Sequence, residues 1–146
     1  MRRRTEDGTA IIEFVWLAIL LLVPLVYIVI AVFDTQRTAY AASTAARSAT
    51  RAFVTSPDEA SARVRANAAA RLAFADQGLE GAPLDVVIRC RPDPDNCLAP
   101  GEVVSAEVRS SVALPLIPDV LGDNVPRISV SALHQSPYGT FREDRK

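Results

Sequence analysis

The sequence predicts an α+β fold, in which a long N-terminal helix precedes a second helix packed on a small antiparallel sheet of about three strands. Three observations predict this fold. Residues 8–33 are almost wholly apolar, residues 34–55 are rich in alanine and lack Gly and Pro, and three stretches of alternating apolar residues follow. The chain has 146 residues, enough for the long helix and one domain of about 100 residues.

The apolar run is long enough to cross a membrane. Residues 14–33 carry no charge, and about 20 apolar residues span the hydrocarbon of a bilayer as a helix. We therefore expect a transmembrane helix over residues 9–33. Glu13 stands inside the run, where a carboxylate costs roughly 2.5 to 3.5 kcal/mol and usually has a partner or a function. Pro24 removes one backbone hydrogen bond in mid-helix.

The charges before this run predict its orientation. Three arginines, Arg2 to Arg4, precede it, and positive charge beside a first transmembrane segment is usually kept in the cytoplasm. The N-terminus is therefore expected in the cytoplasm, and the C-terminal domain outside the cell membrane.

We expect the helix to continue as a water-exposed stem over residues 34–55. Arg47 and Arg51 share one face of this stem, four residues apart. Small apolar residues and one phenylalanine lie towards another face: Ala42, Ala45, Ala46, Ala49 and Phe53. Such a face suits close packing of helices, and a solvated helical spacer is the alternative.

A second helix is predicted from Ser56 to Gln77. Ser56 is the expected N-cap, Pro57 the first helical residue, and Gly78 the stop. Glu59 is expected to pair with Arg63 on the solvent side. The predicted apolar face, which should pack on the sheet, consists of Ala60, Val64, Ala68, Leu72 and Ala75.

The strands are predicted at residues 84–90, 102–114 and 127–133, in antiparallel order. The connection over 114–126 contains too much Pro and Gly for regular structure. A small extracytoplasmic domain thus spans residues 56–136, and the polar residues 137–146 are expected to be a flexible tail.

Cys90 and Cys97 are the only cysteines, and the six residues between them form a turn-rich loop with two prolines. We expect them to form a disulfide, which persists only in an oxidising compartment. A zinc site would need more ligands than two cysteines and the single histidine, His134. His134 is instead expected to be a strand residue, and no metal or cofactor is expected.

Composition and motifs argue against several function classes. The net charge is −1 and no basic cluster follows the first four residues, so we expect no nucleic-acid partner. The sequence has no Gly-rich phosphate loop, no metal-ligand spacing and no nucleophile pattern near the histidine. We therefore expect no enzymatic activity.

The segment Gly8-Thr9-Ala10-Ile11-Ile12-Glu13-Phe14 resembles the processing site of type IV prepilins. It has a short basic leader that ends in Gly, a glutamate five residues after the cut, and then an apolar helix. The short leader, the small C-terminal domain and its paired cysteines resemble the TadE-like family, the pseudopilins of the tight-adherence (Flp) pilus system. The resemblance is specific in the first third of the chain and extends to the rest only in layout.

The resemblance implies a pilin-like subunit of a bacterial cell membrane, which contributes to pilus assembly for adhesion or secretion. A prepilin peptidase would remove the leader, residues 1–8, by cutting between Gly8 and Thr9, and Glu13 would become the fifth residue of the mature chain. The implied partners are that peptidase, other pilin or pseudopilin subunits, and the pilus assembly platform. The amine of Thr9 and the carboxylate of Glu13, when paired between subunits, would offset the cost of burying charge.

Two alternatives remain open. One is an unprocessed single-pass protein, whose anchored domain has a structural or interaction role. The other is a secreted protein whose signal peptide ends at Ala39-Tyr40-Ala41, which matches the A-x-A pattern of a cleavage site. An apolar region of this length, with Asp34 and Arg37 before the cut, does not favour a signal peptide.

Overall fold

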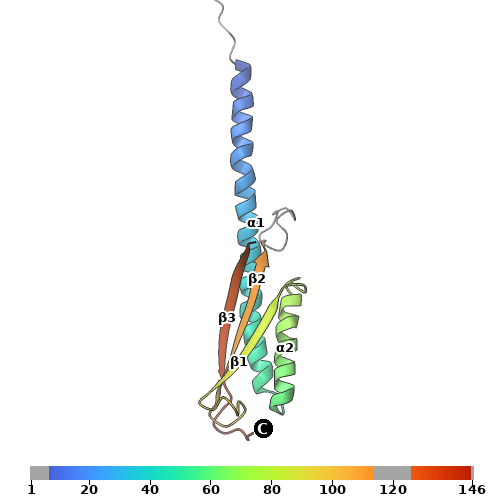
Figure 1. Ribbon diagram of the computed structural model, residues 1–146, viewed down its shortest axis with the longest axis vertical. Helices are drawn as coiled ribbons and strands as arrows, with labels where there is room; N and C mark the ends of the chain where they lie inside the picture. The colour runs from blue at the N-terminus through green and yellow to red at the C-terminus, as the bar shows by residue number, and fades with distance from the viewer. Residues whose placement is uncertain (1–6, 114–125, 146) are drawn as a thin grey trace, which may run out of the picture.

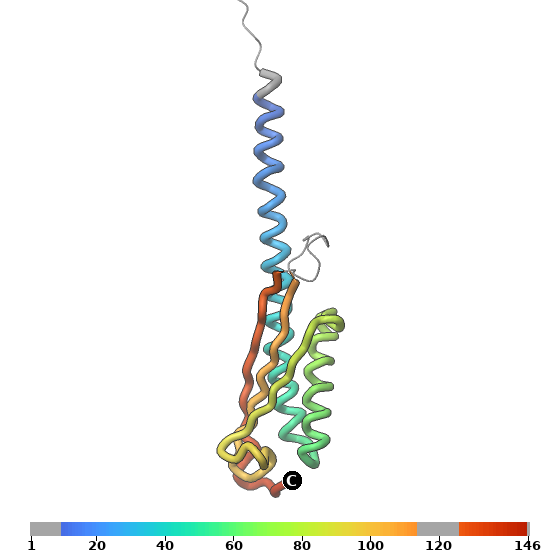
Figure 2. Tube along the Cα trace, in the orientation of Figure 1, coloured from blue at the N-terminus to red at the C-terminus, as the bar shows by residue number. Residues whose placement is uncertain are grey.

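The computed structural model describes residues 7–113 and 126–145 (Figure 1). Within these residues, two helices precede three strands: α1 (Asp7–Val54), α2 (Glu59–Ala75), β1 (Leu84–Arg91), β2 (Val103–Ala113) and β3 (Arg127–Pro137). The predicted α+β class, with one long helix, a second helix and a three-stranded antiparallel sheet, is confirmed. Figure 2 shows that the N-terminal half of α1 extends alone, while α2 and the sheet lie beside its C-terminal half.

The predicted membrane segment and stem form one continuous helix of 48 residues, which passes through Pro24. The helix ends just before Pro57, because the residue that precedes a proline is disfavoured in helical conformation. The Ser56 hydroxyl donates a hydrogen bond to the carbonyl oxygen of Ala52 at 2.7 Å. Ser56 therefore closes the end of α1.

The predicted N-cap of the second helix was wrong by two residues. Asp58 is the N-cap, with extended backbone angles, and its side chain accepts a hydrogen bond from the Ser61 N–H at 2.8 Å. Ser56 is unavailable for this role because its hydroxyl is bonded to α1. The helix consequently begins at Glu59.

The predicted stop of α2 at Gly78 is confirmed. Gly78 has a φ of 64°, and the Leu79 N–H bonds the Phe74 carbonyl at 2.9 Å, which is a Schellman-type helix end. Arg37 of α1 donates to the carbonyl oxygens of Gln77, at 2.6 Å, and Gly78, at 2.8 Å. A Cβ atom at Gly78 would lie 2.7 Å from the Arg37 guanidinium, so the close approach of α1 also favours glycine here.

The sheet has the order β1-β2-β3, and both pairs are antiparallel. Val104 of β2 lies opposite Cys90 on one side and Ser136 on the other. β3 runs to Pro137, further than predicted, because its pairing with β2 continues to Val103. The predicted irregular connection over 114–126 lies, except for Pro126, outside the described residues.

The core lies between the C-terminal half of α1, α2 and the inner face of the sheet. The residues of the predicted packing face of the stem, four alanines and one phenylalanine, are all buried: Ala42, Ala45, Ala46, Ala49 and Phe53. The prediction of close packing is confirmed for this face, which is not a solvated spacer. Small side chains are needed here because bulkier ones would hold the helices and the sheet apart.

The predicted apolar face of α2 was wrong. The buried residues are Ala62, Ala66, Ala70, Ala73 and Phe74, and they pack mainly against α1 instead of the sheet. Val64 and Leu72, predicted to be core residues, are 69% and 64% exposed. Every face of this helix contains alanine. The spacing of its apolar residues therefore could not predict which face is buried.

The C-terminal tail, which was expected to be flexible, folds back onto the domain in its described residues, which end at Arg145. Tyr138 is buried, and its hydroxyl donates to the Glu143 carbonyl at 2.9 Å. Arg142 and Arg145 donate to the carbonyl oxygens of Val54 and Ser56, at 2.6 and 3.1 Å. The tail thus covers the C-terminal end of α1, where carbonyl groups lack helical partners.

Candidate functional site

The first candidate site is the apolar half of α1. The large aliphatic, Phe and Trp side chains between Ile11 and Phe33 are 40–71% exposed, and nothing among the described residues covers them as a core would. The helix is long and apolar enough to cross a membrane. A continuous apolar surface of this size requires lipid or other protein subunits around it.

Two acidic residues bound the uncharged part of this helix. Glu13 and Asp34 are 21 positions apart in one continuous helix, which corresponds to about 32 Å along its axis. The hydrocarbon layer of a bilayer is about 30 Å thick. If Asp34 lies at one boundary of that layer, Glu13 lies at the other. In the sequence, Glu13 is one helical turn after Ala10, where the apolar residues begin.

Gly8 and Thr9, the residues of the predicted cleavage site, fall within the bounds of α1. They precede Glu13 by five and four residues, a little more than one helical turn. The rest of the predicted leader, including Arg2 to Arg4, lies outside the described residues. The carboxylate of Glu13 is on an exposed residue, so another molecule can reach it.

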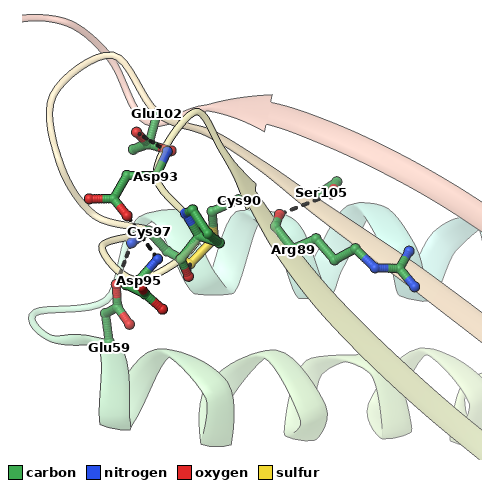
Figure 3. Close-up of a disulfide and its surroundings, with 9 residues drawn as sticks. Glu59, Arg89, Cys90, Asp93, Asp95, Cys97, Glu102 and Ser105 are labelled. Carbon is green, nitrogen blue, oxygen red and sulfur yellow. Dashed lines mark hydrogen bonds between the residues drawn. A yellow bond between two sulfur atoms is a disulfide. The ribbon is translucent and has the colours of Figure 1, made fainter.

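The second candidate site is the loop that Cys90 and Cys97 close (Figure 3). The two residues form a disulfide, with their Cα atoms 5.2 Å apart, a usual separation for such a bond. Cys90 lies in β1, Cys97 in the loop that follows, and both side chains are buried. The disulfide therefore fixes the loop to the end of the sheet that lies away from the N-terminal half of α1 (Figure 1).

Two glutamates hold this loop from either side. Glu59, at the first position of α2, accepts a hydrogen bond from the Cys97 N–H, and the buried Glu102 accepts one from the Asp93 N–H at 3.0 Å. Figure 3 shows both contacts. The expected Glu59–Arg63 pair is not formed, because the Glu59 carboxylate turns to the loop. The loop is thus bonded to the start of α2 and to the residue that precedes β2.

Two carboxyl groups at the protein surface have shifted pKa values. The Ser61 N–H, which bonds the side chain of Asp58, lowers the pKa of that carboxyl from its ordinary value of 3.8. The guanidinium of Arg109, and then that of Arg89, lower the pKa of Glu107 from its ordinary value of 4.5. Both shifts serve local structure, because one group caps a helix and the other links strands β1 and β2.

Within residues 7–113 and 126–145, no group of three or more His, Cys, Asp or Glu side chains is placed to hold a metal ion. His134 lies in β3, as predicted, where its carbonyl oxygen accepts a bond from the Thr50 hydroxyl at 3.4 Å.

Three features of these surfaces were not predicted from the sequence. They are the contact of Glu59 with the disulfide loop, the arginines that cover the end of α1, and the exposed apolar face of α2. The first two join residues 38 and 88 positions apart, so no local pattern signals them. The third was visible as an apolar stripe but was assigned to the core.

The fold is α+β and pilin-like in its layout, with a small domain built on the C-terminal half of one long helix. Comparisons of the chain with protein-family models, curated proteins and solved structures find no match.

Proposed function

We propose that this chain is a TadE-like pseudopilin, a minor pilin that contributes to assembly of a Flp/Tad type IV pilus for adhesion or secretion. The observation that carries the proposal is the placement of Gly8 and Glu13 on one helix. A simple anchor needs neither a glycine at the end of a basic leader nor a carboxylate five residues later. The unbroken helix and its uncovered apolar half support the proposal.

In this proposal the chain crosses the bacterial cell membrane once, with its N-terminus in the cytoplasm. The disulfide of Cys90 and Cys97 supports this orientation, since such bonds persist outside the cytoplasm. A prepilin peptidase cuts between Gly8 and Thr9 at the inner face. Glu13 lies close to that face in the proposed orientation, so the new amine of Thr9 and a neighbour's carboxylate lie at similar depth.

Assembly then uses charge pairing in a layer of low dielectric. The Thr9 amine of one subunit pairs with the Glu13 carboxylate of the next, which offsets the cost of placing both charges near hydrocarbon. The pairing also fixes the register of neighbouring helices. The partners are the peptidase, other pilin or pseudopilin subunits and the assembly platform.

N-terminal sequencing and intact mass of the membrane-extracted chain test the proposal. The expected protein begins at Thr9 and lacks residues 1–8. A chain that begins at Met1 would favour the unprocessed, anchored domain with a structural or interaction role. A chain that begins at Ala42 would favour a secreted protein, although Ala41 and Ala42 are both fully buried in α1 and cleavage there would cut through the core.

A further inference from the structure

Helix α2 has a second apolar face, which the chain itself does not cover in its described parts. Four residues at helical spacing form this outer face: Ala60, Val64, Ala68 and Leu72. The opposite face of the same helix is buried on α1. A helix that is apolar on two sides, with one side open, indicates a missing partner for the open side.

The outer face continues into a groove of about 450 Å³ between the end of α2 and the start of β1. Leu72 belongs to both, which makes the outer face and the groove one continuous surface. The groove is lined mainly by apolar side chains: Phe74, Ala75, Leu79, Ala82 and Leu84. A partner can therefore bury large side chains in the groove while its backbone follows α2.

The charges beside this surface are mainly positive. Arg63, Arg65 and Arg71 are all exposed on α2, and none of them forms an ion pair within 4.0 Å among the described residues. The acidic residues stand at the two ends of this surface: Asp58 caps the start of α2 and Glu59 is bonded to the disulfide loop, whereas Asp76, the C-cap, and Glu80 lie at the groove end. A complementary partner carries carboxylates along most of its length.

A lipid surface does not fit this geometry. α2 lies alongside α1 (Figure 1), and Val64 is 14 residues before Gly78, about 20 Å along the helix axis. A bilayer that α1 crosses can approach the Gly78 end, where Arg37 is bound, but not Val64 at the same time. A second copy, paired face to face about a twofold axis, would bring the arginines of one copy close to the like-charged arginines of the other.

We propose that the outer face of α2 and its groove bind an amphipathic helix of another protein, whose apolar stripe is flanked by Asp or Glu. The apolar stripe covers Val64 and Leu72, and the flanking carboxylates meet Arg63, Arg65 and Arg71. This interaction goes beyond the proposed function, since it requires neither cleavage at Gly8 nor the charge of Glu13.

Photocrosslinking of the full chain in its native membranes tests the proposal. Leu72 is replaced by benzoylphenylalanine, and Leu133, which is 60% exposed on β3, is replaced in a matched control. We expect an adduct with another protein from position 72, at least fivefold above that from position 133. The crosslinked peptide, sequenced by mass spectrometry, should contain an apolar helical stripe with Asp or Glu on both sides.

Charge variants test whether the arginines of α2 contribute to binding of the proposed partner. Combined Arg63→Glu and Arg71→Glu should reduce the adduct at least fivefold, whereas Arg63→Lys with Arg71→Lys should retain it. Equal melting temperatures of the variants in detergent exclude a folding defect. The proposal is overturned if position 72 crosslinks to lipid, to a second copy, to residues 114–125 of its own chain, or to nothing. The proposal is also overturned if the crosslinked peptide has no Asp or Glu beside its apolar stripe. An adduct yield that is unchanged by the two Arg→Glu substitutions overturns it as well.

Discussion

The guanidinium of Arg142 lies 2.6 Å from the carbonyl oxygen of Val54, the last residue of α1. This bond stabilises the helix end in two ways, because it satisfies a free carbonyl and places positive charge at the negative end of the helix dipole. It also joins the C-terminal tail to the end of α1.

Arg142→Ala should therefore lower the stability of the full chain by about 1 kcal/mol, the usual net value of such a hydrogen bond. Urea unfolding in detergent measures the change. Thr140→Ala, at an exposed tail position without a described side-chain bond, is the control and should have little effect. Equal unfolding midpoints for the two variants would mean that the contact contributes nothing.

The disulfide gives a second prediction. Alkylation of the unreduced protein from its native host should modify neither Cys90 nor Cys97, as intact mass would report. Replacement of both by serine should lower stability by about 2 to 3 kcal/mol, since the bond closes a loop of about eight residues. Two alkylated cysteines in the native protein would contradict the disulfide and the proposed orientation.

The alanine face of α1 gives a third prediction. Ala45 is fully buried between packed elements, so Ala45→Leu should cost about 1 to 3 kcal/mol or more by overpacking. Ala39→Leu, on the exposed side of the same helix, adds the same atoms where they meet no core. Thermal unfolding of the two variants in detergent compares them, and a similar melting temperature would contradict the close packing.

Much of the fold could be predicted because its signals are local. Pro57, Gly78 and the alternating apolar residues mark element ends and strands without reference to distant parts of the chain. The packing face of α2 could not be predicted, since Ala66 is buried and Ala68 exposed although they are the same residue type. Ala66 is buried because α1 packs against its side of α2. The sequence of α2 alone does not show which side α1 contacts.

In the candidate site, too, local features could be predicted from the sequence and long-range contacts could not. Gly8 and Glu13 form a local motif, and their spacing carries the proposed function directly from the sequence. The contact of Arg142 with Val54 depends on how the chain folds back over 88 positions. Long-range contacts of this kind leave no periodic pattern, so the sequence indicated only a polar tail.

The lowered pKa values predict that stability falls in acid. Asp58 and Glu107 have lower pKa values in the folded state than their ordinary values of 3.8 and 4.5, so the unfolded chain binds more protons as the pH falls. Their contribution is complete above about pH 5 and is lost as the pH falls through the folded-state values. Both groups lie at the protein surface, so the effect should be small and should weaken with salt.

Melting temperatures in detergent between pH 3 and pH 7 measure this loss. Asp58→Asn keeps a capping oxygen but cannot titrate, so this variant should show a flatter profile than the unchanged chain. An identical slope for both proteins would show that Asp58 does not contribute to the acid sensitivity.

Processing and assembly can be separated by two substitutions in α1. Gly8→Leu should block cleavage, because a bulky side chain obstructs the backbone at the peptidase site, and the membrane-bound chain should be about eight residues heavier. Glu13→Ala should act differently. It removes the charge at the edge of the hydrocarbon, so insertion should be no worse, but the pairing with a neighbour's Thr9 amine is lost and pilus assembly should fail.

Glu13→Asp is the matched control, since it keeps the charge and should retain part of the assembly. Intact mass of the membrane fraction and electron microscopy of surface pili give the two readouts. Suppose that Gly8→Leu left the mass unchanged and Glu13→Ala left assembly and adhesion intact. The chain would then be an ordinary anchored domain, because neither the leader nor the carboxylate would have the role that their spacing on one helix predicts.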